Sequence, residues 1–249
     1  MLLNLLYASS EARNQLMQNL TTSEAFFMII VVAVVGMIVQ WRLRSVMTEY
    51  SKVELPAGLT GAQIAERMLA EHNIHDVRVV STNGFLSDHY DPRNKTVNLS
   101  AEIYHGRSIT AAAVACHECG HAVQHATGYA PLQMRSALVP LVNVSSRLAT
   151  WVVILGLIMT ASSGSQIICW IGVGLMCMSA LFSIITLPVE YNASDRALAW
   201  LQSSGTLSPS EMKGAKISLR WAARTYLVAA LSAIASILYY VALINGRRK

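Results

Sequence analysis

Four long runs of apolar residues divide the chain, and they predict four helices that span a membrane. The runs cover residues 25–41, 137–161, 166–189 and 226–244. A helix crosses the hydrocarbon core of a bilayer with about 20 predominantly apolar residues, and each run comes close to this length. A large buried helical core is the alternative interpretation, but four such runs in 249 residues favour the membrane. We therefore expect a mainly α-helical, multi-pass membrane protein.

The polar stretches between these runs divide the rest of the chain. Residues 1–24 form an N-terminal polar segment, residues 45–135 are the one sizeable soluble region, and residues 190–224 are a polar helical segment. The first apolar run is not followed by a small-residue cleavage site. We therefore interpret it as a retained anchor and not as a removed signal peptide.

Within residues 45–135, part of the pattern alternates between apolar and polar positions. Alternation over residues 75–80 and 95–100 predicts two strands. The turn sequence at 91–94 contains Asp, Pro and Asn, and it joins residues 85–90 to the second of these strands as a hairpin. We expect a small sheet whose edge strand is able to pair with an extended peptide.

Helical spacing of apolar residues flanks this small sheet on both sides. Before the sheet, Thr60 is placed to cap an amphipathic helix. After the sheet, Ser108 or Thr110 caps a longer, alanine-rich helix. The order of helix, small sheet and long helix predicts a compact α+β domain between the first two spans.

The longer helix carries the motif His-Glu-x-x-His, which is typical of catalytic zinc sites. His117 and His121 are four residues apart and therefore lie on one helical face, where both rings can bind a single ion. Glu118 is rotated from that line by about 100°, and it can act as general base toward a water beside the ion. Two imidazoles and a carboxylate are costly to bury without a partner, which favours the metal interpretation.

A catalytic zinc ion usually has three protein ligands, so the motif lacks one. His125 lies on the same helical face, but roughly 12 Å of helix separates it from His117, and both cannot bind one ion. Glu190 stands at the end of the third apolar run, where a bare carboxylate is expensive without a cation. Asp195 and Glu102 remain the alternatives for the third ligand.

Topology and charge place these residues on one side of the membrane. Two crossings by the second and third spans return Glu190 to the side of His117. Only 13% of the residues are charged and 53% are hydrophobic, whereas a soluble domain carries about 25% charged residues. The net charge of +5 needs no nucleic-acid partner, and the partner that we expect is the lipid bilayer.

The positive-inside tendency places the motif in the cytoplasm, although the basic C-terminus opposes this orientation. Basic residues on the motif's side are Arg42, Arg44, Lys52, Arg135, Arg196, Lys213, Lys216, Arg220 and Arg224.

Four separated blocks of the sequence together resemble the YugP-type membrane zinc metallopeptidases, over about residues 50–245. The blocks are HECGHAVQHATGYAPLQMRSALVP, LSDHYDPRNKTVNLS, GLTGAQIAERML and TLPVEYNASDRAL. Those proteins look like distant relatives of the HtpX and CAAX-endopeptidase group, with a small gluzincin domain embedded among transmembrane helices. The resemblance implies one zinc ion held by His117, His121 and Glu190, with Glu118 as the catalytic base.

The chain departs from the pattern of the HtpX group beside the third ligand. That group has an aspartate four residues after its ligand glutamate, where this chain has Ser194, with Asp195 one position later. Either side chain can orient a histidine ligand. The other residues expected near the ligands or the substrate are Arg196, His125 and His89. The donor to the scissile carbonyl remains open among His89, Tyr90, Arg196 and Tyr226.

The resulting expectation is an endopeptidase at the cytoplasmic face of the cell membrane, acting on peptides or membrane proteins. A non-catalytic membrane scaffold or adaptor with a structural metal is the competing class. Proteolysis inside the bilayer is a third, but polar residues on both sides of the motif favour a site at the membrane surface. The substrate is undefined, and an adaptor protein or a homo-oligomer remains open.

Overall fold

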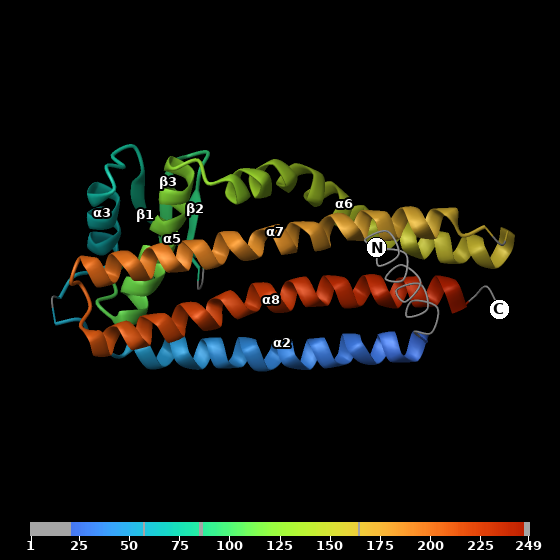
Figure 1. Ribbon diagram of the computed structural model, residues 1–249, viewed down its shortest axis with the longest axis horizontal. Helices are drawn as coiled ribbons and strands as arrows, with labels where there is room; N and C mark the ends of the chain where they lie inside the picture. Colours follow the sequence, from blue (N-terminus) through green and yellow to red (C-terminus); the bar gives the residue numbers. More distant parts are fainter. Residues whose placement is uncertain (1–20, 57, 85–86, 164, 247–249) are drawn as a thin grey trace, which may run out of the picture. The chain divides into compact units, whose positions relative to one another are not determined.

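The structure is a computed structural model that describes residues 21–56, 58–84, 87–163 and 165–246. Its elements are labelled in Figure 1. In chain order they are α2 (Thr22–Ser51), α3 (Gly61–Glu71), β1 (Arg78–Thr82), β2 (His89–Asp91), β3 (Thr96–Ser100), α4 (Ala101–His105), α5 (Ile109–Ala126), α6 (Ala130–Ser163), α7 (Ile167–Ser203) and α8 (Pro209–Gly246). The predicted polar segment 1–24 lies almost entirely outside the described residues.

Four of the described helices, α2, α6, α7 and α8, are long and apolar enough to cross a membrane. The prediction of four candidate spans in a mainly helical chain is thus confirmed. The helices extend beyond the apolar runs. Helix α7 continues without a break from Ile167 to Ser203, so Glu190 lies within it and does not begin a separate helix.

The chain divides into two compact units. The first unit contains the described parts of Met1–Gly36, Leu138–Ser183 and Val228–Lys249, and the second contains Met37–Ala137 and Ile184–Leu227. The sheet, α3, α4 and α5 all belong to the second unit. Each of the long helices contributes one part to each unit.

A hydrophobic core fills the second unit around α5. The alanine-rich face of α5 lets α3 pack closely, with Ile64 and Met68 fully buried. Leu99 of β3 and Leu201 of α7 complete this core from other directions and are also fully buried. Burial of a large aliphatic side chain stabilises a fold by about 1.5–3 kcal/mol, so this cluster holds α5 firmly in place.

The sheet has three strands in the order β1-β3-β2. β3 is central, parallel to β1 and antiparallel to β2, with Tyr90 opposite Val97. The predicted hairpin between the second and third strands is confirmed. Asp91 stabilises its turn, because Oδ1 accepts a hydrogen bond from the backbone N–H of Arg93 at 2.8 Å. β2 is therefore an edge strand of the described sheet.

Capping side chains and a glycine turn set the ends of the helices in the second unit. Thr60 caps α3 together with Gln63, each side chain accepting from the backbone N–H of the other, as the sequence predicts. Of the two candidates for the cap of α5, the structure selects Ser108, whose Oγ accepts from the N–H of Ala111. After α5, Gly128 adopts a φ of +64°, and this turn lets α6 begin at once.

Candidate metal centre

Two helices of the second unit bring three potential metal ligands together. α5 presents His117 and His121, whose ring centroids lie 4.9 Å apart, and α7 presents Glu190. The ligand atoms of these three side chains all lie within 4.8 Å of one another. Among the described residues, this is the group that the structure assembles with metal-ligand chemistry.

A glycine between the two histidines allows α7 to approach α5 closely. A Cβ atom at Gly120 would lie only 2.5 Å from the backbone oxygen of Ala193. Any larger residue at position 120 would push the two helices apart. The missing side chain therefore places Glu190 and Ser194 beside the face of α5 that carries the histidines.

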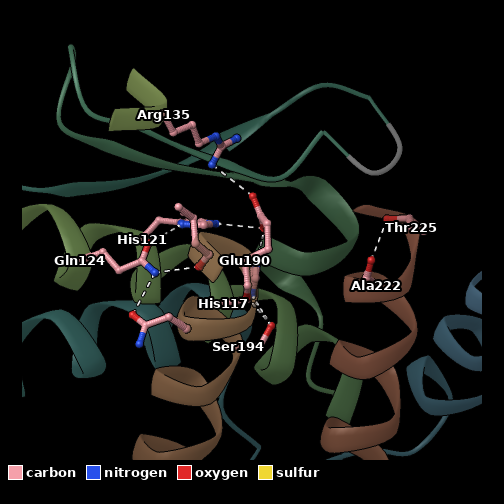
Figure 2. Close-up of polar contacts among 10 residues, drawn as sticks. His117, His121, Gln124, Arg135, Glu190, Ser194, Ala222 and Thr225 are labelled. Carbon is pink, nitrogen blue, oxygen red and sulfur yellow. Dashed lines mark hydrogen bonds and ion pairs between the residues drawn. The ribbon is translucent and has the colours of Figure 1, made fainter. Parts of the chain in front are cut away.

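A hydrogen-bond chain fixes the tautomer of His117. The hydroxyl of Ser194 donates its single hydrogen to the backbone oxygen of Glu190 at 2.9 Å. Its oxygen lies 3.1 Å from Nδ1 of His117, so it accepts the hydrogen that Nδ1 carries. Nε2 of His117 then has a free lone pair, and this atom faces the carboxylate of Glu190 (Figure 2).

A second chain fixes the tautomer of His121 in the same way. The amide nitrogen of Gln124 donates to the backbone oxygen of Val189 at 2.7 Å and to Oδ1 of Asn192 at 3.0 Å. The amide oxygen of Gln124 is therefore turned toward Nδ1 of His121, at 3.0 Å, and accepts its hydrogen. Nε2 of His121 is left with a lone pair as well.

Three lone-pair atoms consequently converge with no hydrogen among them. Oε2 of Glu190 lies 3.2 Å from Nε2 of His117 and 3.4 Å from Nε2 of His121. Zinc bonds of about 2.0–2.1 Å in a tetrahedron put neighbouring ligand atoms about 3.3 Å apart. The donor set and these two distances thus fit a zinc ion, for which neutral imidazoles and a carboxylate are ordinary ligands.

Burial and charge at this point favour a cation of some kind. Glu190 is 2% exposed, and a buried carboxylate requires a positive partner. Burial disfavours the charged form of His121, but the nearby carboxylates of Glu190 and Glu118 outweigh it and raise the pKa of that imidazole above its ordinary value. The carboxylate therefore attracts either a proton or a metal ion to the same place.

Glu118 is buried beside this cluster, with 8% of its surface exposed. Burial raises the pKa of its carboxyl above the usual value, against the opposing effect of the two histidines. A carboxylate with a raised pKa is a stronger base than an exposed one, which suits it to accept a proton.

Arg135 forms an ion pair with Oε1 of Glu190 at 3.1 Å. Its side chain is 30% exposed and comes from the second turn of α6. Arg135 and Gln124 are the two residues of the centre that sequence reasoning missed as site residues. Gln124 gave a weak signal, because it follows His121 by three residues on the same helix. Arg135 gave none, since its contact depends on the reversal of the chain at Gly128.

Four other candidates from the sequence lie outside this cluster. His125 is exposed, and its Nδ1 bonds the hydroxyl of Tyr90 at 2.8 Å, which ties α5 to β2. His89 is exposed and its Nδ1 bonds the backbone oxygen of Ser87. Asp195 and Glu102 are exposed as well, and neither is in the group of ligand atoms.

Of the two side chains considered for orienting a histidine, Ser194 makes the contact. Arg196 acts one step further away, because its Nε donates to Oδ1 of Asn192 at 2.8 Å and so supports the Gln124 chain. Among the candidates for a carbonyl donor, Tyr226 of α8 interacts electrostatically with Glu190, Glu118 and Arg135.

The fold and the site define a helical protein with four candidate spans and a candidate metal centre of three donors on the α5–α7 helix pair. The chain matches the family model described as "Putative neutral zinc metallopeptidase" over residues 25–245. It belongs to this zinc metallopeptidase family. It is also 39% identical over 224 residues to the "Putative membrane protease YugP" of Bacillus subtilis (strain 168), an alignment that covers 89% of this chain and 98% of the relative. No solved structure matches the chain.

Proposed function

We propose that this chain is a membrane-embedded zinc endopeptidase whose gluzincin-like site is His117, His121 and Glu190 with Glu118 as base. The convergence of three lone-pair atoms at 3.2 and 3.4 Å carries the proposal. The family match supports the zinc ion and the peptidase class. The likeness to a membrane protease supports peptide or membrane-protein substrates.

The chemistry of the reaction is divided among the side chains of the centre. A zinc ion, when bound, polarises the scissile carbonyl and acidifies a water molecule. Glu118 takes one proton from the attacking water as the oxygen–carbon bond forms. It then passes that proton to the nitrogen as the peptide C–N bond breaks, so that an amine leaves. Tyr226 donates a hydrogen bond to the carbonyl oxygen as negative charge develops on it.

The edge of β2 is the proposed binding site for an extended substrate. β2 carries free backbone groups on its outer side in the described sheet, and the Tyr90–His125 contact holds this strand against α5. A cavity of about 370 Å³ adjoins this region and is lined in part by Asp88 and Val114. Asp88 also contributes to the electrostatic surroundings of Glu118, and we propose that this cavity receives a side chain of the substrate.

The site is proposed to face the cytoplasm at the surface of the cell membrane. The basic residues that follow the first span and precede the fourth support this orientation through the positive-inside tendency. The accessibility of a cysteine introduced by Arg93→Cys, labelled from outside intact cells, tests it. Labelling without permeabilisation would contradict a cytoplasmic site.

The decisive experiment combines metal analysis with peptide cleavage in detergent. Glu118→Gln keeps the size of the side chain but cannot accept the proton, so we expect normal zinc content with turnover lower by a factor of about 10³ or more. Glu190→Ala should lose bound zinc as well as activity, because it removes a ligand.

Two results would contradict the proposal. Unchanged proteolysis in Glu118→Gln would exclude that residue as the base, and full zinc content in Glu190→Ala would exclude it as a ligand. A non-catalytic scaffold remains the competing class, and it would show a fourth protein ligand that closes the coordination sphere. X-ray absorption of the zinc-loaded chain distinguishes a closed site from one with a water ligand.

A further inference from the structure

The two carboxylate oxygens of Glu190 have different partners. Oε2 faces Nε2 of His117 and Nε2 of His121, whereas Oε1 accepts a hydrogen bond from Nη1 of Arg135 at 3.1 Å. Figure 2 shows Arg135 on one side of Glu190 and the histidines on the other. Each oxygen is therefore committed to a separate cation, one supplied by the protein and one to be supplied by the metal.

This division matters because a carboxylate can bind a metal ion through one oxygen or through both. With both oxygens bound, Glu190 would raise the coordination number and occupy the position that a water molecule needs. A catalytic zinc site requires three protein ligands and one open position. The guanidinium of Arg135 attracts Oε1 away from the metal, and a charge-assisted hydrogen bond of this kind is strong in a buried site.

Arg135 is the group that covers Oε1 of Glu190 in the native chain. With Arg135 in place, Glu190 is only 2% exposed. Apart from the two histidines, Arg135 is the only cation that forms an ion pair with Glu190 among the described residues. Arg196 of α7 is engaged elsewhere: its Nε donates to Asn192, and its guanidinium lies 5.9 Å from the ring centroid of Tyr129.

We propose that Arg135 is a positioning residue that holds Glu190 in one-oxygen ligation and thereby keeps a coordination position open for water. The inference rests on the proposed zinc site. In this proposal, a residue at the start of α6 controls how many oxygens of Glu190 bind the metal ion, although α6 contributes no ligand. Because the turn at Gly128 joins α5 to α6, a single short connection links the histidine ligands to the residue that controls the third ligand.

The test compares coordination number in chains that cannot turn over substrate. Arg135→Gln is introduced into the Glu118→Gln background, and the protein is loaded with zinc for X-ray absorption and with cobalt for visible absorption. We expect the coordination number to rise from about four to about five as Oε1 joins the metal, with weaker visible cobalt bands. Arg78→Gln is the matched control, since this exposed arginine of β1 makes the same change of charge away from Glu190.

Chemical rescue protects the test against a variant that fails to fold. Arg135→Ala leaves a gap that reaches solvent, because the native side chain is 30% exposed. Added ethylguanidinium should enter this gap and restore the four-coordinate spectrum. A purely structural role of Arg135 would not be restored by a small cation in solution. In the chain with Glu118 intact, we also expect kcat to fall by about 10–100-fold in Arg135→Gln, with little change in KM.

The outcomes separate this inference from the proposed function. A four-coordinate spectrum that is unchanged in both Arg135 variants would overturn the role of Arg135. Absence of metal from the parent chain would overturn the zinc site and the inference together. A coordination change in Arg135→Gln, in a protein that cleaves no peptide, would support the inference while contradicting the peptidase function.

Discussion

The two units of the chain differ in where their large apolar side chains lie. In the second unit the largest fully buried side chains include those of Ile64, Met68 and Leu99, as in the core of a water-soluble domain. In the first unit large apolar side chains lie on the surface, with Trp151 72% and Ile158 63% exposed. A water-soluble protein would hide these surfaces, so the contrast indicates two different solvents for the two units.

The first unit holds its helices together with small residues. A Cβ atom at Gly156 would lie 2.5 Å from the backbone nitrogen of Cys169, and one at Gly172 would lie 2.4 Å from the side chain of Val153. Close backbone approach of this kind is how helices pack when the surrounding lipid is as apolar as their side chains. In the second unit, Gly120 allows the same close approach of two helices at the candidate metal centre. There the approach also places Glu190 beside the two histidines.

The largest difference between the two units should appear when one isoleucine in each unit is replaced by alanine. Ile64→Ala removes a fully buried side chain of the second unit and should lower the free energy of unfolding by about 2–5 kcal/mol. Ile158→Ala removes a 63% exposed side chain of the first unit and should change it by less than about 0.5 kcal/mol in detergent. Unfolding curves followed by circular dichroism measure both, and equal losses would break the distinction between the units.

Tyr226→Phe tests whether Tyr226 of α8 donates a hydrogen bond to the substrate carbonyl, as proposed. Loss of the phenol oxygen should lower kcat by about 10²–10³-fold, equivalent to about 2.7–4 kcal/mol, with zinc content unchanged. Tyr239→Phe is the control on the same helix, because that ring packs against Phe26 in the first unit. Activity that survives in Tyr226→Phe would assign the carbonyl donor to another group.

Gly120→Ala should separate helix packing from metal binding. The added methyl meets the backbone of Ala193, and relief of this clash should cost about 1–3 kcal/mol and weaken zinc binding by moving Glu190. Gly174→Ala in α7 meets no atom within 4 Å and should be neutral or slightly stabilising. Isothermal titration with zinc and thermal unfolding give the two readouts. Normal zinc affinity in Gly120→Ala would show that the helix spacing does not position the ligand.

The smallest expected effect is a change in zinc affinity when one of two serines of α7 is replaced. Both serines make the same hydrogen bond to the helix backbone. Ser194 and Ser183 each donate to the backbone oxygen four residues earlier, but only Ser194 also accepts from His117. Ser194→Ala should weaken zinc binding by about 10–100-fold, and Ser183→Ala should leave it unchanged. Competition with a chromogenic chelator measures the difference, and equal affinities would remove Ser194 from the centre.

The sequence by itself determined those features that depend on local spacing. Apolar runs predicted the four long helices, alternation predicted the hairpin, and a four-residue interval placed His117 and His121 on one face. Helix rise alone separated His125 from the other two histidines, and the structure places it against Tyr90 of β2. Each of these inferences uses distances along one element, which the periodicity of that element fixes.

The tertiary structure decided which residues from distant segments meet. Seventy-three positions separate His117 from Glu190, and their contact requires α5 and α7 to approach at Gly120. Ser194 contacts His117 and Asp195 does not, because a step of one residue turns a side chain by about 100° around a helix. Arg135 reaches Glu190 through the turn at Gly128, and no spacing in the sequence encodes that meeting. These contacts depend on how whole helices pack, and packing depends on many residues at once.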